Sequence, residues 1–371
     1  MSAETTWETP EDIFADDLDR AAGLQAVADA MRGADARPWP ETLDNLADLV
    51  REERARRTAA EPLAPASSLL RAVFADIHDR YTRRQETGQD AIGHSTGFPR
   101  LDRILGGLDR GRMSIFLAAP GAGKTTLSNQ LAYTVAASGA PVVYVSFENS
   151  PEDLVLKQVA RIADKSASEI RRGMISPIDL QAAHETFQRG AGQRLFYVTG
   201  TSATSIETLR AALNLAQRRH PKLPPVLVVD FLQRLATTSM VVGRGAGLDD
   251  MRGRVGIIAQ QLRELATETG AHIWAISSTN RAAYNTDKAT PTLASARESG
   301  DVEFAADHVI TLASGNSDGL SMTTDPYMLG VIKNRHGETG NVSISRERHT
   351  LRMAETETKS TAFAKPIRAS A

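Results

Sequence analysis

Two glycines, a lysine and two threonines follow a short apolar run in the stretch 118–126, which reads AAPGAGKTT. Gly121 and Gly123 lack a Cβ, so the backbone can curl closely around an anion. Lys124 supplies a movable cation for the terminal phosphates of a nucleotide, and the Thr125 hydroxyl can ligate the accompanying Mg²⁺. The stretch is typical of a phosphate-binding loop, with Ala118 in place of the usual first glycine. The residues expected to bind ATP are Ala119, Pro120, Gly121, Ala122, Gly123, Lys124, Thr125 and Thr126.

The segments on either side of this loop support that interpretation. Residues 113–117 are apolar like a buried strand, and Leu127, Leu131 and Val135 share one face of a helix predicted over 125–137. The first N–H groups of such a helix lack intrahelical partners and point outward, which suits a polyphosphate. A chance loop of small residues ending in an exposed lysine is the alternative, and the strand and helix around it favour nucleotide binding.

Two carboxylates close apolar strands elsewhere in the chain. Asp230 ends the run 226–230 (VLVVD), and Glu148 follows 145–147. Taken singly, an acid after a strand is more often a helix cap or a turn residue. Beside a phosphate-binding loop, however, Asp230 is expected to hold the Mg²⁺ itself or a water bound to it, and Glu148 to orient and deprotonate the attacking water. The pair therefore predicts hydrolysis in addition to binding.

Strand-like and helical segments alternate after Gly97, which predicts an α/β fold. The expected strands cover 113–117, 141–147, 195–198, 225–230 and 272–277, and the expected helices between them cover 151–164, 206–219 and 255–269. Near-continuous apolar strands between helices indicate a mostly parallel sheet covered on both faces. Four further strands over 308–312, 328–334, 342–346 and 350–353 predict an antiparallel extension at one edge.

The remainder of the chain divides into smaller parts. Residues 1–65 are expected to form a small, acidic helical region, and 66–92 a linker helix with an apolar stripe at Leu70, Phe74, Ile77 and Tyr81. Residues 93–353 are the expected main domain, and 354–371 a disordered tail. The stripe must pack either on its own domain or on a neighbouring copy, and the sequence leaves both open.

Composition limits the classes of protein. Lys+Arg 43 against Asp+Glu 45 gives a net charge of −2, so the whole-chain charge indicates neither a nucleic-acid nor a membrane partner. With no cysteine, disulfides, thiolate metal sites and thiol nucleophiles are excluded. The acidic N-terminus and the lack of a long apolar run predict a cytoplasmic protein without membrane contact.

Several separate motifs between Ser68 and Met353 resemble the RecA-like motor domain of the DnaB-type replicative helicases. The segments that carry the resemblance are 95–102 (STGFPRLD), 146–152 (SFENSPE), 230–233 (DFLQ), 277–281 (SSTNR), 297–303 (RESGDVE) with Asp307, and 333–337 (KNRHG). The resemblance implies a RecA-like P-loop NTPase fold and an ATP-dependent DNA helicase that works in replication. It also implies a homo-oligomeric ring of six subunits with ATP at each interface.

The same resemblance assigns roles to residues outside the loop. Arg335, with Lys333 beside it, would enter the nucleotide site of the next subunit, where a guanidinium stabilises charge on the γ-phosphate. Without the family, a surface salt bridge is the commoner role for such an arginine. Arg297, Glu298 and Gly300 would grip single-stranded DNA through its phosphates. The glycine-rich segment 237–254 suits either a mobile channel loop or an ordinary surface loop.

The chain departs from the family pattern in two places. Ser278 stands where the family has a glutamine that is thought to sense the γ-phosphate, so coupling to DNA would be weaker or would use Asn280. The N-terminal region of about 65 residues is shorter than the family's helical domain, so contact with primase or a loader is not supported.

Two other functions fit the same residues. A RadA-like recombination or repair ATPase also carries a Lys-Asn-Arg run followed by glycine. An ATP-gated regulatory or defence assembly protein would hydrolyse ATP without using DNA. Single-stranded DNA should stimulate ATP hydrolysis by a helicase or by a recombination ATPase, but not by an ATP-gated assembly protein.

Overall fold

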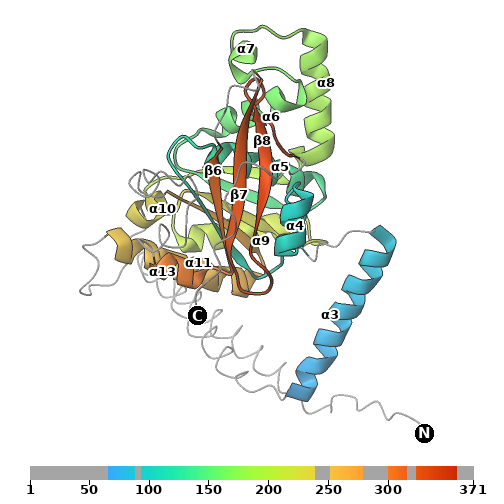
Figure 1. Ribbon diagram of the computed structural model, residues 1–371, viewed down its shortest axis with the longest axis vertical. Coiled ribbons are helices and arrows are strands. Elements are labelled where there is room, and N and C mark those ends of the chain that lie inside the picture. The colour runs from blue at the N-terminus through green and yellow to red at the C-terminus, as the bar shows by residue number, and fades with distance from the viewer. Residues whose placement is uncertain (1–65, 88–92, 239–250, 279–299, 316–322, 357–371) are drawn as a thin grey trace, which may run out of the picture. The chain divides into compact units, whose positions relative to one another are not determined.

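The computed structural model describes residues 66–87, 93–238, 251–278, 300–315 and 323–356 (Figure 1). The chain falls into two units, Met1–Thr87 and Gly88–Ala371. In the first unit, helix α3 (Ala66–Thr87) carries the predicted apolar stripe, and Leu70, Phe74, Ile77 and Tyr81 are each more than half exposed. Helix α3 thus lies within the segment 66–92, and the apolar stripe is exposed as far as the described residues extend.

A single nine-stranded sheet forms the centre of the second unit, in the order β3-β2-β4-β5-β1-β6-β7-β8-β9. The six strands from β3 to β6 pair in parallel, and β7, β8 and β9 continue antiparallel. This confirms the predicted α/β fold with its antiparallel C-terminal extension. The strands are β1 (Met113–Ala118), β2 (Val142–Ser146), β3 (Leu195–Thr199), β4 (Val226–Asp230), β5 (His272–Ser278), β6 (His308–Ser314), β7 (Thr324–Asn334), β8 (Gly340–Glu347) and β9 (Met353–Glu355).

Helices cover both faces of this sheet because both sides of each parallel strand are apolar. Along β5, for example, Trp274 and Ile276 pack into one core while Ile273 and Ala275 pack into the other. The first core includes residues of α4 (Pro99–Leu105), α5 (Lys124–Ala137) and α6 (Pro151–Ile162). The second includes residues of α9 (Ile206–Arg219), α10 (Leu232–Thr238), α11 (Met251–Thr269) and α13 (Gly300–Ala305).

Some elements differ from the sequence-based expectation. Residues 167–192, where no element was expected, form α7 (Ala167–Arg171), α8 (Pro177–Phe187) and the π-helical turn η2 (Gln188–Gly192). Strand β9 covers Met353–Glu355, whereas the expected last strand covered 350–353. The carboxylate of Glu355 accepts hydrogen bonds from the N–H groups of Arg100 and Leu101, so it links β9 to the first turn of α4.

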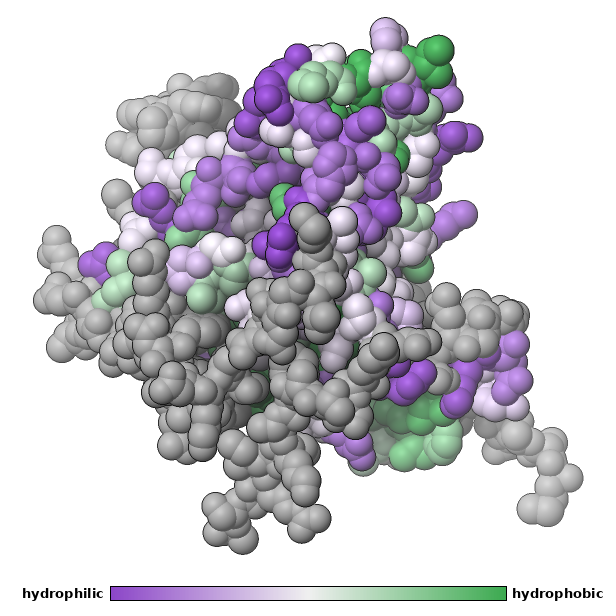
Figure 2. Space-filling view, turned by 45° about the horizontal axis from the view of Figure 1, so that its top comes forward, coloured by the Kyte–Doolittle hydropathy of each residue, from purple (hydrophilic) through white to green (hydrophobic). Residues whose placement is uncertain are grey.

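The surface over α7 and α8 carries an apolar patch. Met174, Ile178 and Leu180 are 57%, 81% and 43% exposed, and hydrophobic side chains gather at this end among hydrophilic ones (Figure 2, top). None of the helices in the described residues is both long and apolar enough to cross a bilayer. The same residues contain no cluster of three or more His, Asp or Glu arranged for a metal ion.

Two buried histidines lie side by side in the sheet, at the edge where β1, β5 and β6 begin. The Ser114 hydroxyl is 3.1 Å from both His272 Nε2 and His308 Nδ1, and the two rings stack with centroids 6.5 Å apart. Burial lowers the pKa of His272 to about 3 and that of His308 to about 4. Both side chains are therefore neutral in the fold at physiological pH.

This pair predicts a loss of stability in mild acid. In the unfolded chain each histidine takes up a proton near pH 6.5, whereas in the folded chain it does so only near pH 3–4. Between these values the unfolded state binds more protons, so the free energy of unfolding falls by about 1.4 kcal/mol per pH unit per histidine as the pH drops. Urea denaturation at pH 7.5, 6.5, 5.5 and 4.5 measures this slope. His272→Gln should make it shallower, and an unchanged slope in that variant would contradict the assignment.

Candidate nucleotide-binding site

The loop between β1 and α5 turns at two glycines. Gly121 (φ 78°) and Gly123 (φ 99°) both have the left-handed backbone that other residues rarely adopt. The N–H of Ala122 donates to the carbonyl of Ala119 at 3.1 Å and closes the turn. A Cβ at Gly121 would meet no atom within 4 Å, so this side of the loop is open. Helix α5 begins directly afterwards at Lys124, and its first N–H groups are available to an anion in the loop.

Lys124 lies within the curve of this loop. Its ammonium donates to the carbonyls of Ala118 and Ala119 at 2.9 and 3.0 Å. Burial lowers the pKa of Lys124, and the negative charges of Asp230 and Glu148 counteract that shift. The structure thus brings the predicted lysine and both predicted carboxylates within electrostatic reach of one another.

Asp230 ends strand β4, which lies two strands from β1 in the sheet. Its carboxylate accepts hydrogen bonds from the hydroxyls of Thr125 and Tyr144, the latter at 2.9 Å, and is only 2% exposed. Burial is the main cause that raises the pKa of Asp230, so a cation beside it would favour its charged form. A buried carboxylate next to a hydroxyl is a set of hard oxygen ligands that fits Mg²⁺.

Glu148 stands in the short loop between β2 and α6. Helix α6 starts at Pro151, with the Ser150 hydroxyl accepting a hydrogen bond from the N–H of Asp153, so Glu148 remains outside the helix. The residue is exposed, and its charge acts on both Lys124 and Asp230. This placement suits a base that reaches water over the phosphate-binding loop.

The C-terminal strands contribute residues that the sequence did not indicate. A Cβ at Gly123 would lie 2.9 Å from Met353 Cε and 3.6 Å from Arg346 Nη1. Met353 is fixed there because its main chain exchanges hydrogen bonds of 2.6 and 3.0 Å with the Gln130 side chain of α5. The antiparallel extension therefore forms one wall of the loop, which only the three-dimensional register of β8 and β9 could reveal.

Ser278 lies at the end of β5, paired with Ala118 at the end of β1. The side chain of Gln233 from α10 reaches this point: its amide nitrogen is 2.9 Å from Ser277 Oγ and 3.1 Å from Ser278 O. Ser278 stands where the family has a glutamine. An amide group does lie beside this end of β5, but it belongs to Gln233, in the segment after Asp230. Asn280 lies outside the described residues.

Arg335 and Lys333 do not join this site. Asn334, at the end of β7, pairs with His308, and His308 pairs with Ser114 at the start of β1. Arg335 therefore lies at the edge of the sheet where β1 begins, whereas the loop follows the other end of β1. The six residues of β1 separate the two edges by about 17 Å, which is farther than an arginine side chain can reach.

Lys333 and Arg335 instead bind helix α13. The ammonium of Lys333 donates to Glu303 O at 2.5 Å, and Arg335 Nη2 donates to Phe304 O at 3.3 Å. Gly300, one of the three predicted DNA contacts, is the first residue of α13. Arg297 and Glu298 lie outside the described residues. The predicted loop 237–254 is described only at its two ends, which belong to α10 and α11, and residues 239–250 lie outside the described residues.

Comparisons with known proteins show which proteins this chain is similar to. The chain is 25% identical over 276 residues to a probable plasmid replicative DNA helicase of Chlamydia psittaci, which covers 74% of this chain and 58% of that protein. It is 26% identical over 247 residues to the replicative DNA helicase DnaB of Helicobacter pylori, covering 66% and 49%. The chain thus spans about half the length of the curated relatives it matches.

Solved structures share the fold. The ATPase domain of G40P matches with a TM-score of 0.68 at 20% identity, over 80% of this chain and 100% of that one. A DnaB-like replicative helicase, solved in a study of its interactions with primase, matches with a TM-score of 0.72 at 17% identity, over 93% and 78%. The family model described as the DnaB-like helicase C terminal domain matches residues 93–355. This match covers well over half of the chain, which therefore belongs to the DnaB-like helicase C-terminal domain family.

Proposed function

We propose that this chain is the ATP-hydrolysing motor of a hexameric helicase that moves along single-stranded DNA during replication. The observation that carries the proposal is the division of the site between two edges of the sheet. Lys124, Thr125 and Asp230 meet at one edge, and Arg335 lies at the other. A head-to-tail ring brings the second edge of one copy against the first edge of the next.

In this arrangement each residue has a distinct task. The backbone of the loop and Lys124 bind the β- and γ-phosphates. Thr125 and Asp230 would hold Mg²⁺, which supplies positive charge to the phosphate oxygens. Glu148 accepts the proton of the attacking water. Arg335 of a neighbouring copy stabilises the charge that develops on the γ-phosphate, so hydrolysis depends on how the two copies are docked.

The surface around Arg335 supports burial against another copy. Phe304, whose carbonyl accepts a hydrogen bond from Arg335, exposes 82% of its surface. A phenylalanine this exposed, next to a guanidinium, has the composition of an interface anchor. The exposed stripe of α3 offers a second apolar surface for assembly.

Helix α13 offers a route from DNA to the nucleotide. Its first residue is Gly300, which belongs to the proposed DNA contact with Arg297 and Glu298. Its last carbonyls hold Lys333 and Arg335. If a DNA strand moved the start of this six-residue helix, it would also move Arg335, the arginine proposed to enter the next nucleotide site.

The rate of ATP hydrolysis with and without single-stranded DNA tests the proposal. We expect DNA to stimulate hydrolysis at low salt, with the stimulation weakening as salt rises because phosphate contacts release counterions. Dextran sulfate serves as a control polyanion and should not stimulate. Equal rates with and without DNA would remove both the helicase and the recombination ATPase, and would favour an ATP-gated assembly protein.

A further inference from the structure

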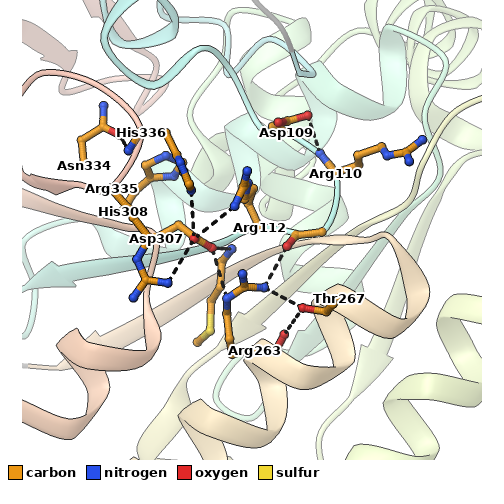
Figure 3. A network of polar contacts seen from close by, with 12 residues as sticks. Asp109, Arg110, Arg112, Arg263, Thr267, Asp307, His308, Asn334, Arg335 and His336 are labelled. Atoms are coloured by element: carbon orange, nitrogen blue, oxygen red, sulfur yellow. Dashed lines mark hydrogen bonds and ion pairs between the residues drawn. The ribbon is translucent and has the colours of Figure 1, made fainter. Parts of the chain in front are cut away.

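The carboxylate of Asp307 lies at the centre of a polar network at the edge of the sheet opposite the phosphate-binding loop (Figure 3). Its side chain is completely buried, between α13 and β6. The N–H of Met113 donates to Oδ2 at 2.9 Å. Three guanidiniums surround the same carboxylate, those of Arg112 at 3.7 Å, Arg263 at 3.4 Å and Arg335 at 3.8 Å. One acid therefore joins β1, α11 and the end of β7.

Asp307 fixes the segment after β7 at several atoms. The N–H of Arg335 donates to the carbonyl of Asp307 at 2.9 Å, and His336 Nε2 lies 3.4 Å from Asp307 Oδ1. Arg335 Nη2 also donates to Phe304 O. Both the backbone and the guanidinium of Arg335 are thus placed by Asp307 and by the turn of α13 just before it.

The charges of this network are unequal. Within the part of the chain that the structure describes, three guanidiniums face the one carboxylate of Asp307, which leaves a surplus of positive charge that a second anion can neutralise. Arg335 is the most exposed of the three, with 45% of its side chain accessible against 32% and 20% for Arg112 and Arg263. Burial alone would raise the pKa of Asp307, but the Met113 N–H and the arginines outweigh it and hold that pKa below its usual range. The acid therefore stays charged.

We propose that Asp307 is a positioning residue for Arg335, holding it ready to enter the nucleotide site of the neighbouring copy. The inference rests on the proposed function of Arg335 and adds the group that orients it. A guanidinium that is already oriented needs little reorganisation when it meets the γ-phosphate, and a misplacement of about 1 Å can reduce the rate about 100-fold. The Asp307 side chain is fully buried, so it would act on the nucleotide only through Arg335.

Asp307→Asn tests this role, because the amide keeps the shape of the side chain and removes its charge. We expect kcat for ATP hydrolysis to fall about 10–100-fold while ATP affinity stays within about twofold of wild type, since the phosphate-binding loop is about 17 Å away. Glu207→Gln is the matched control. It removes another carboxylate that pairs with an arginine, Arg210 at 2.6 Å on α9, and should leave kcat unchanged.

A double-mutant cycle separates positioning from a general structural effect. If Asp307 acts through Arg335, Asp307→Asn should add no further loss of kcat to Arg335→Ala. The inference would be overturned if the double variant lost kcat by the product of the two single losses, or if Asp307→Asn kept the wild-type kcat. Either result would leave the proposed function intact. Wild-type kcat in Arg335→Ala alone would instead refute the proposed role of Arg335.

The loss of one buried acid among three arginines could also unfold the chain. In that case Asp307→Asn combined with Arg112→Met reduces the surplus charge, and circular dichroism confirms the fold. The same cycle with Arg335→Ala then gives the answer: if Asp307 acts through Arg335, adding the Asp307 and Arg112 changes to Arg335→Ala should cause no further loss of kcat, and an added loss would contradict positioning.

Discussion

Glu148→Gln is expected to lower the turnover of ATP by about 10²–10⁴-fold, the usual contribution of a positioned general base. ATP affinity should stay equal or rise slightly, because the variant removes a negative charge whose field reaches Lys124 at the phosphate-binding loop. Single-turnover hydrolysis and equilibrium binding of a fluorescent ATP analogue measure the two effects separately.

Glu152→Gln is a matched control for this prediction. Glu152 is an exposed acid in the first turn of α6, four residues after Glu148, and the charges that shift the pKa values of Lys124 and Asp230 include Glu148 but not Glu152. Its variant should hydrolyse ATP at the wild-type rate. Near-normal turnover in Glu148→Gln would assign the base elsewhere, whereas a loss of affinity in the same variant would make Glu148 a binding residue.

The phosphate-binding side of the site was predictable because its signals are local. A strand, a glycine turn and a helix start follow one another within 113–137, and acids at strand ends reveal Glu148 and Asp230. In an α/β sheet the carboxyl ends of parallel strands meet at one edge. The order β2-β4-β5-β1 then brings these separate strand ends together.

The remaining contacts depend on pairing over long distances in sequence. Met113 and Asp307 are 194 residues apart, and Gln130 and Met353 are 223 apart, so no periodicity within a window of residues can predict them. The residue Asp307 was visible as part of a family motif, but its partners were not. Likewise, α7 and α8 bury few apolar side chains, which leaves them with weak helical patterns.

The distribution of charge between the two edges fits the proposal that hydrolysis depends on contact between neighbouring copies. At the loop edge, a bound triphosphate beside Glu148 and Asp230 carries more negative charge than Lys124 and Arg346 can neutralise. At the opposite edge, three arginines and a buried acid leave positive charge in excess. In the proposed ring, a contact between the two edges of neighbouring copies would balance both.

Arg335→Ala is accordingly expected to reduce kcat about 10³-fold, the scale associated with an arginine supplied in trans. The variant keeps its own loop, Lys124 and Glu148, so ATP binding should remain. Arg218→Ala, which removes an exposed arginine from the last turn of α9, should leave kcat unchanged.

Mixing two inactive variants tests whether Arg335 acts in trans. Copies with Lys124→Ala lack a working nucleotide site but offer an intact Arg335, and copies with Arg335→Ala offer the reverse. In rings mixed at random, about a quarter of the interfaces combine both intact groups, so activity should reappear at up to about a quarter of the wild-type rate. An arginine that acted within its own chain would give no recovery, since every copy in the mixture would still lack one of the two groups.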